Sequence, residues 1–263
     1  MNEHKGIRVC AVNYLNTKPL LFGLVTKQLE QITELKLDYP ANCVKFLKSG
    51  ISNLALMPVA AITDIDNAQI ISNYCIGSNR YVRSVCIYSK VPLDQVKTIM
   101  LDFQSRTSVV LARVLCKEYF NVNPEFKAAE ESFLKEIEGT TAAVVIGDKA
   151  LEIENQFEYK YDLGEAWFQL TGLPFVFAAW VTNTNLDDSF IEDFNSALAF
   201  GINHIPSLML LLPNLSNHIN LESYFTKNIS YDFDEEKKKA LALFHDKLNQ
   251  YGLIKQSRKL NIG

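Results

Sequence analysis

The stretch VNYLNTKPL, residues 12–20, joins a strand pattern to a helix pattern. Residues 7–12 are a short apolar run that predicts a strand, and apolar residues recur at helical spacing from Leu20 onward. Small polar side chains, Asn16 and Thr17 among them, lie between the two. They either cap the N-terminus of the helix or hold a ligand against its exposed N–H groups. The stretch predicts a strand, a polar loop and a helix, in that order.

The same order of strand and helix repeats along most of the chain. It favours an α/β fold with mainly parallel strands, because parallel neighbours need a helical crossover between them. The predicted strands lie at residues 7–12, 35–39, 54–57, 69–72, 84–88, 98–102, 142–146 and 175–181; the predicted helices lie at 19–29, 43–49, 109–120, 132–138 and 149–155, with two long helices that begin near Ser189 and Asp234.

The composition is ordinary for a globular protein and excludes several classes of partner. The net charge of −4 argues against nucleic acid, because phosphate binding needs concentrated Lys and Arg. The five cysteines show no CxxC spacing and the four histidines are scattered, so we expect reduced thiols, no metal and no cofactor. The sequence has no apolar run of membrane-spanning length and no signal-peptide core, which predicts a cytoplasmic protein without a membrane partner. No pattern predicts an oligomeric state.

Small polar residues follow several of the predicted strands. Ligands of parallel α/β sheets bind outside the carboxyl ends of the strands, where helix N-termini offer free N–H groups to anions. The sequence has no Gly-rich phosphate loop, so carboxylates fit this pattern better than a nucleotide phosphate. The polar groups are Asn16 with Thr17, Arg83 with Ser84, the run Ser105, Arg106, Thr107 and Ser108, and Gly147 with Asp148.

Each of these groups alone also fits a purely structural role. A polar side chain before a helix is a common N-cap, and an arginine is commonly a surface ion pair. Only the agreement of several loops favours a ligand site. The signals for catalysis are sparse, because the sequence has no GxSxG motif and no histidine in the polar loops. Asp102, Asp148 and Glu165 remain as candidate bases.

Six ordered segments make the chain resemble the chorismate dehydratases of menaquinone biosynthesis by the futalosine pathway. The resemblance implies a type 2 periplasmic-binding-protein fold, with two α/β lobes and a ligand cleft between them. Residues 1–86 with 179–263 would form one lobe, and residues 87–178 the other. The segments are NYLNTKPLLFGL (13–24), LALMPVAAI (54–62), IGSNRYVRSV (76–85), SRTSV (105–109), VIGDKAL (145–151) and YDLGEAWFQLTGLPFVFAAW (161–180).

The resemblance also implies a reaction, the loss of water from chorismate to give 3-[(1-carboxyvinyl)oxy]benzoate. The enzyme would be a hydro-lyase whose partner is a small dicarboxylate. Asn16 would orient the reacting edge and hydrogen bond to the departing hydroxyl. The enolpyruvyl carboxylate of the substrate would take the proton, with Asp148 as a second candidate for acid or base, or as an N-cap. The remaining residues expected to line the cleft and hold the substrate are Pro58, Val59, Ser84, Arg106, Thr107, Ser108 and Gly147.

Three alternatives stay open beside this interpretation. A sibling enzyme of the same pathway makes 1,4-dihydroxy-6-naphthoate on the same fold, and the resemblance places a histidine base there where this chain has Gly147. A non-catalytic solute-binding protein would normally carry an export signal or a lipobox cysteine. The effector lobes of a transcription regulator would follow an N-terminal helix-turn-helix, whereas a strand already begins at residue 7.

Overall fold

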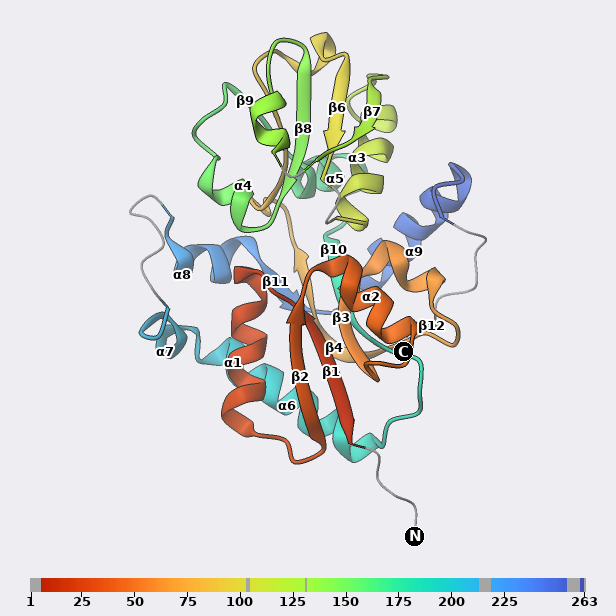
Figure 1. Cartoon of the computed structure of the whole chain (residues 1–263), viewed down its shortest axis with the longest axis vertical. Helices are drawn as coiled ribbons and strands as arrows, with labels where there is room; N and C mark the ends of the chain where they lie inside the picture. Colours follow the sequence, from red (N-terminus) through yellow and green to blue (C-terminus); the bar gives the residue numbers. More distant parts are fainter. Residues whose placement is uncertain (1–5, 103–104, 131, 213–218, 255–260, 263) are drawn as a thin grey trace.

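The protein is built from two sheets, one above the other in Figure 1. This computed structural model describes residues 6–102, 105–130, 132–212, 219–254 and 261–262. One sheet has seven strands in the order β11-β4-β10-β3-β1-β2, with β12 paired to β4, and the other has five in the order β7-β6-β8-β5-β9. We call the seven-stranded sheet with its helices the large lobe, and the five-stranded sheet with its helices the small lobe.

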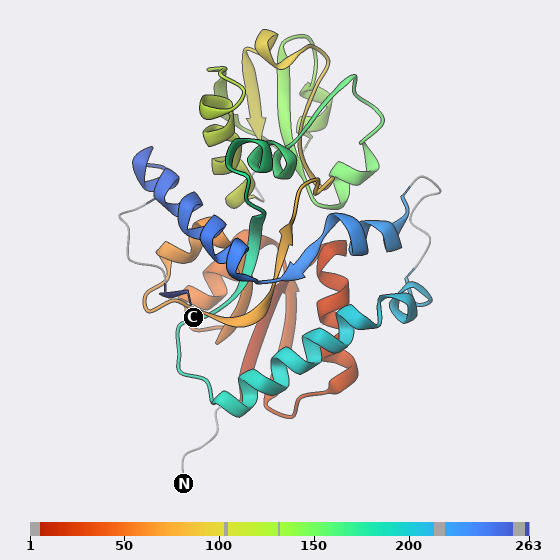
Figure 2. The ribbon, with the colours of Figure 1, turned by 180° about the vertical axis from the view of Figure 1, so that it is seen from behind.

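The large lobe contains both ends of the described chain. β1 pairs in parallel with β2 and β3, while β10 returns antiparallel between β3 and β4. Figure 2 shows α6 and α9 crossing the back of this lobe. Its strands are β1 (Ile7–Val12), β2 (Ile32–Asp38), β3 (Leu54–Pro58), β4 (Gln69–Ser78), β10 (Phe175–Thr182), β11 (Ser230–Asp232) and β12 (Asn261–Ile262); its helices are α1 (Lys18–Lys27), α2 (Pro40–Lys48), α6 (Asp188–Asn203), α7 (Ile205–Met209), α8 (Leu221–Ser223) and α9 (Glu235–Gln250).

The small lobe consists of the middle of the chain. β6 pairs in parallel with β7 and β8, and β5 lies antiparallel between β8 and β9. Its strands are β5 (Val85–Ser89), β6 (Thr98–Leu101), β7 (Glu125–Ala128), β8 (Thr141–Ile146) and β9 (Tyr159–Asp162); its helices are α3 (Thr107–Glu118), α4 (Asp148–Glu152) and α5 (Leu163–Thr171).

The chain passes between the lobes twice, after β4 and before β10. The Asp162 carboxylate fixes the first passage, because it accepts hydrogen bonds from the N–H groups of Val82 and Arg83 as well as from the first turn of α5. β5 pairs only within the small lobe, and β10 only within the large lobe. The lobe limits at residues 86/87 and 178/179 stay a prediction.

An aromatic cluster packs beside the second passage. Trp167 of α5, Phe175 of β10 and Phe244 of α9 are fully buried, with ring centroids 4.9–5.8 Å apart in edge-to-face arrangements. Such pairs add stability beyond the apolar area that they bury. The cluster joins a helix of the small lobe to a strand and a helix of the large lobe.

Most predicted elements are present, and the differences have local causes. The strand predicted at 69–72 continues to Ser78, because its second half also pairs with β10 and β11. Gly77 lies inside the strand, where a Cβ atom would be 2.7 Å from the Phe175 carbonyl oxygen. The helix predicted at 132–138 is a short 3-10 helix, Phe133–Glu136. The elements that the prediction missed are β7, β9, β11, β12, α5, α7 and α8. β7 and β9 are edge strands of four residues, too short for a clear alternation pattern.

Helices α1 and α6 pack closely because a glycine of each faces the other helix. A Cβ atom on Gly23 would lie 1.9 Å from the Ala197 carbonyl oxygen, and one on Gly201 would lie 2.0 Å from the Pro19 carbonyl oxygen. Both obstacles are backbone, which cannot rotate away as a side chain can. This contact fixes α1, and with it the loop that precedes α1, against the large lobe.

Replacing Gly23 by Ala should lower the free energy of unfolding by about 1–3 kcal/mol, even though Ala is the better helix former, because the helices must separate. Urea denaturation measures the change. Ser196→Ala on the exposed face of α6 is the control and should leave stability unchanged or slightly higher. A Gly23→Ala variant as stable as the wild type would contradict the packing described here.

Candidate active site

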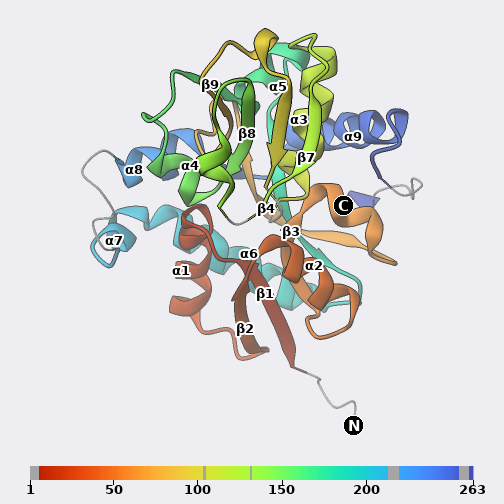
Figure 3. The ribbon, with the colours of Figure 1, turned by 45° about the horizontal axis from the view of Figure 1, so that its top comes forward.

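A crevice lies between the lobes, at the carboxyl ends of several strands. Its empty volume is about 540 Å³, including the open solvent at its mouth. Figure 3 shows α4 and the end of β8 above the connection from β1 to α1. The crevice is lined by Val12, Tyr14, Asn16, Pro40, Pro58, Ile76, Val82, Ser84, Val85, Ser105, Arg106, Thr107, Ser108, Ile146, Gly147, Phe177 and Ala178.

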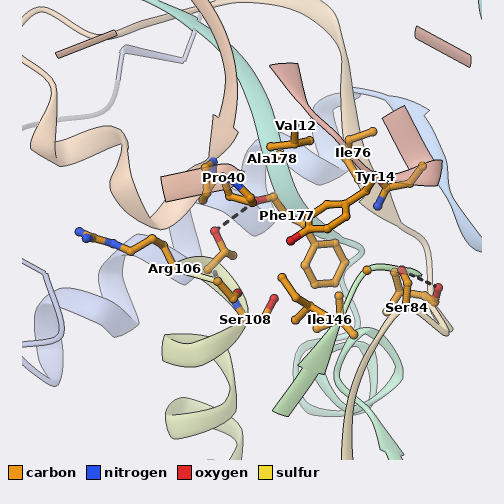
Figure 4. A pocket seen from close by; sticks show the side chains of 17 residues that line it. Val12, Tyr14, Pro40, Ile76, Ser84, Arg106, Ser108, Ile146, Phe177 and Ala178 are labelled. Carbon is orange, nitrogen blue, oxygen red and sulfur yellow. Dashed lines mark hydrogen bonds between the residues drawn. The ribbon is translucent and has the colours of Figure 1, made fainter. Parts of the chain in front are cut away.

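The polar loops predicted from the sequence meet at this crevice. Val59 and Asp148 lie beside it, and the other candidates that the sequence offered, Thr17, Arg83, Asp102 and Glu165, are not among the lining residues either. The predicted site residues that line it are Asn16, Pro58, Ser84, Arg106, Thr107, Ser108 and Gly147. Figure 4 shows Ser84 on one side, Ser108 on the other, and the rings of Tyr14 and Phe177 between them. The structure therefore brings together residues that are up to 131 positions apart in the chain, from Asn16 to Gly147.

The crevice is lined by apolar groups and by uncharged hydrogen-bonding groups. Among the described lining residues, Arg106 carries the only charged side chain. Its guanidinium forms an ion pair with Asp64 at 2.7 Å and extends away from Tyr14 and Phe177. That pair is a surface contact, as one of the structural interpretations predicted, since half of the Arg106 side chain is exposed. No group of three His, Cys, Asp or Glu side chains that could hold a metal occurs in the described part of the chain.

Asn16 lies in a 3-10 turn, Leu15–Thr17, between β1 and α1. Thr17 is the N-cap of α1 but makes no capping hydrogen bond with its side chain, so neither polar residue serves as a side-chain cap here. The Asn16 Oδ1 atom accepts from the Thr17 hydroxyl at 3.3 Å, and the Asn16 carbonyl oxygen accepts from the Tyr231 hydroxyl at 3.0 Å. The residue is 9% exposed, at the crevice wall.

Ser84 connects the crevice to the passage between the lobes. Its carbonyl oxygen accepts from the Gly147 N–H at 2.8 Å. Its Oγ atom accepts from the Tyr224 hydroxyl at 2.8 Å and lies 3.4 Å from the Val82 carbonyl oxygen. The residue is fully buried, so these protein partners hold it at the crevice wall.

The start of α3 forms the opposite wall. Arg106 is its N-cap residue, and the Oγ atom of Ser105, just before it, accepts from the Ser108 N–H at 3.2 Å. The Thr107 hydroxyl is used between the lobes: it accepts from the Ala60 N–H at 3.2 Å and donates to the Phe177 carbonyl oxygen at 3.1 Å. The polar residues of this loop therefore do more than cap one helix.

The end of β8 makes a second contact between the lobes. Gly147 has φ +64°, a backbone conformation that residues with a side chain rarely adopt. A Cβ atom there would also lie 2.9 Å from the Tyr14 ring, which is too close. The Asp148 Oδ1 atom accepts from the Leu15 N–H at 3.0 Å. Burial raises the pKa of the Asp148 carboxyl above its ordinary value, against the smaller lowering effect of that hydrogen bond.

Three neighbours of the crevice were missed by the sequence interpretation. Tyr224 and Tyr231 contact Ser84 and Asn16, and the His245 Nε2 atom lies 2.9 Å from the Val59 carbonyl oxygen. All three come from the C-terminal segment, far from the residues that they contact. No motif or polar cluster marks them in the sequence.

Solved structures of low sequence identity share the fold of nearly the whole chain. Protein AF1704 from Archaeoglobus fulgidus matches with a TM-score of 0.74 at 15% identity, over 97% of this chain and 100% of that one. The periplasmic aliphatic sulphonate binding protein SsuA from Escherichia coli matches with a TM-score of 0.62 at 12% identity, over 98% and 95%. The protein is thus of the two-lobed, periplasmic-binding-protein-like class, which confirms the predicted fold.

Within this class the chain belongs to the menaquinone biosynthesis family, whose model matches residues 7–250. It is 27% identical over 159 residues to a chorismate dehydratase from Thermus thermophilus. That match covers 54% of this chain and 58% of the relative's length. The family predicted from the six sequence segments is therefore confirmed.

Thr107→Val should lower the free energy of unfolding by about 1–3 kcal/mol, because it leaves the Ala60 N–H and the Phe177 carbonyl oxygen without their shared partner. Urea denaturation of the unliganded protein measures this. Thr107→Ser keeps the hydroxyl and should retain most of the stability. Equal stability of the Val variant and the wild type would show that the hydroxyl contributes nothing to joining the lobes.

Because His245 is buried, we expect the free energy of unfolding to fall toward acid pH. Burial lowers its pKa from 6.5 to about 4, although the Val59 carbonyl and Asp246 oppose this. The unfolded chain therefore binds the proton first. The stabilisation is complete above about pH 6.5 and falls by up to roughly 3 kcal/mol as the pH drops toward 4. Denaturation curves at pH 7.5, 6 and 5 should show this slope for the wild type and a shallower one for His245→Gln. The same slope in both would contradict it.

Proposed function

We propose that the protein is a chorismate dehydratase, a hydro-lyase that converts chorismate to 3-[(1-carboxyvinyl)oxy]benzoate and water. The observation that carries the proposal is the crevice itself, which lies between two lobes and is lined, apart from Arg106, by uncharged hydrogen-bonding groups and apolar walls. Membership of the menaquinone biosynthesis family and the partial match to a chorismate dehydratase support it.

The chemistry asks little of the protein beyond positioning. Loss of the C4 hydroxyl and the C3 hydrogen makes the ring aromatic, so the reaction is strongly downhill. The C3 carbanion is conjugated through C1=C2 into the ring carboxylate, so the substrate acidifies its own proton. The protein must hold two carboxylates, stabilise the developing enolate and assist departure of the hydroxide. Fixed neutral donors in a crevice that excludes water suit the first two tasks.

The residues divide between the two walls of the crevice. On one wall, the Asn16 carboxamide orients the reacting edge and donates to the departing hydroxyl, while the Ser84 hydroxyl holds a carboxylate. On the other, the Ser108 hydroxyl and the N–H groups of the first turn of α3 hold the second carboxylate. The Thr107 hydroxyl already has two protein partners, so we assign to Thr107 the joining of the lobes over the bound substrate.

The enolpyruvyl carboxylate of the substrate is the proposed proton acceptor. No Asp, Glu or His side chain of the described residues lines the crevice. The Asp148 carboxylate lies outside the lining and accepts from the Leu15 N–H, an arrangement that favours a role in holding the lobes together over one in proton transfer. An internal base on the substrate needs no such side chain.

The geometry at Gly147 argues against the sibling activity on a futalosine-derived substrate. By resemblance, that enzyme carries its histidine base at this position. Here the positive φ and the Tyr14 ring 2.9 Å from the site of a Cβ atom leave no place for an imidazole.

Every helix in the described part of the chain is too short or too polar to span a membrane.

Asn16→Ala should lower kcat for chorismate by about 10²–10³-fold, the cost of removing one well-placed donor to developing charge. Incubation with chorismate, followed by mass spectrometry for the loss of water, measures turnover. Asn13→Ala is the matched control, because Asn13 is an exposed asparagine of the same loop, outside the crevice lining, whose side chain accepts from Lys18.

Two results would count against the proposal in different ways. A folded wild-type protein that leaves chorismate unchanged would refute the activity. A wild-type protein that converts chorismate while Asn16→Ala keeps a near-normal rate would refute the role of the carboxamide and leave the activity standing.

A further inference from the structure

Tyr224 is a fully buried tyrosine placed behind the crevice by an unusual turn of helix. It opens a π-helix of five residues, Tyr224–Asn228, that directly follows α8. Such turns are rare and occur often at functional sites, since they shift side chains out of the regular helical register. The tyrosine is not itself a lining residue of the crevice.

The Tyr224 hydroxyl hydrogen bonds with a residue that does line the crevice. It donates to the Ser84 Oγ atom at 2.8 Å, across 140 positions of the chain. Burial raises the pKa of the phenol well above its ordinary value, so it is neutral and keeps the proton that it donates to Ser84.

The Asn16 carboxamide lies on the same wall as Ser84 and is oriented by its neighbour in the chain. Its Oδ1 atom accepts from the Thr17 hydroxyl, which leaves the amide nitrogen as the donor side. The Tyr231 hydroxyl holds the Asn16 backbone at the carbonyl oxygen.

We propose that Tyr224 is a positioning residue for the reaction: it fixes the Ser84 side chain and strengthens the Ser84 hydroxyl as a donor to the substrate carboxylate. This inference rests on the proposed dehydratase function. The hydroxyl acts through a chain of hydrogen bonds, in which each bond polarises the next. When a carboxylate occupies the crevice, Ser84 turns its proton from the Val82 carbonyl, 3.4 Å away, to the ligand.

Tyr224→Phe tests the proposal because it removes one hydroxyl and keeps the ring. The matched control is Tyr88→Phe. Tyr88 is also fully buried, and its hydroxyl donates to the Ala150 carbonyl oxygen at 2.7 Å inside the small lobe, away from the crevice lining. The thermal midpoints of both variants show whether each folds and how much stability each loses. A merely structural role would make the two variants alike.

With chorismate, Tyr224→Phe should lose about 10–100-fold in kcat/KM, most of it in kcat, whereas Tyr88→Phe should stay within about twofold of the wild type. Tyr224→Phe combined with Ser84→Ala should be less than multiplicative, since both changes break one contact. Calorimetric affinity for the probe 3-[(1-carboxyvinyl)oxy]benzoate should fall about 3–10-fold in Tyr224→Phe alone.

The outcomes separate this inference from the proposed function. If the wild type converts chorismate and Tyr224→Phe matches Tyr88→Phe in rate and affinity, the positioning role is wrong and the function stands. If the wild type binds the probe without converting chorismate, the function is wrong. A selective loss of probe affinity in Tyr224→Phe then still supports the hydrogen-bonding role. If the wild type does neither, both proposals fall.

Discussion

The structure depends on hydrogen bonds that loops at strand ends make across one crevice. Thr107 links the start of α3 to the chain after β3, and Asp148 links the start of α4 to the chain after β1. Each bond joins a side chain of the small lobe to a backbone N–H of the large lobe. Because the Ala60 and Leu15 N–H groups are buried, breaking either bond would leave a donor without a partner, at the free-energy cost of its lost hydration.

The sequence predicts this meeting place because parallel strands share a direction. Polar residues that follow such strands gather at the carboxyl edge of their own sheet, whatever their separation in the chain. Asn16 follows β1 of the large lobe, whereas Ser108 and Gly147 follow β6 and β8 of the small lobe, and all three line the crevice between the lobes. Ser84 joins them from the passage between the lobes, just before β5. Val59 and Asp148 each come one residue after a lining residue and bond to another part of the protein. The Val59 carbonyl oxygen contacts His245, and the Asp148 carboxylate accepts from the Leu15 N–H.

The sequence could not predict the contacts that the C-terminal part of the chain makes with the site. Tyr224 and His245 reach the site region from residues that follow β10, across 140 and 186 positions of the chain. Their contacts depend on how α9 and the π-helix pack on the large lobe. This packing is tertiary structure and leaves no pattern in the local sequence. Tyr224 stands among mostly polar residues, NLESYFTKN (220–228), with no motif beside it, and a lone tyrosine is most simply a core residue. Edge strands β7 and β9 were missed for a related reason, since pairing and not composition makes them strands.

A crevice whose one charged lining side chain among the described residues, Arg106, is paired with Asp64 has a consequence for the proposed chemistry. A buried Lys or Arg would bind both carboxylates of the substrate strongly before reaction, and binding shared by ground state and transition state does not raise kcat. Neutral donors bind the ground state less strongly. During loss of the C3 proton, negative charge spreads onto the ring carboxylate, so donors aimed there gain strength only as the reaction proceeds. The arrangement of Asn16, Ser84 and the first turn of α3 matches that need, and the orientation of the carboxamide decides how much of the gain is realised.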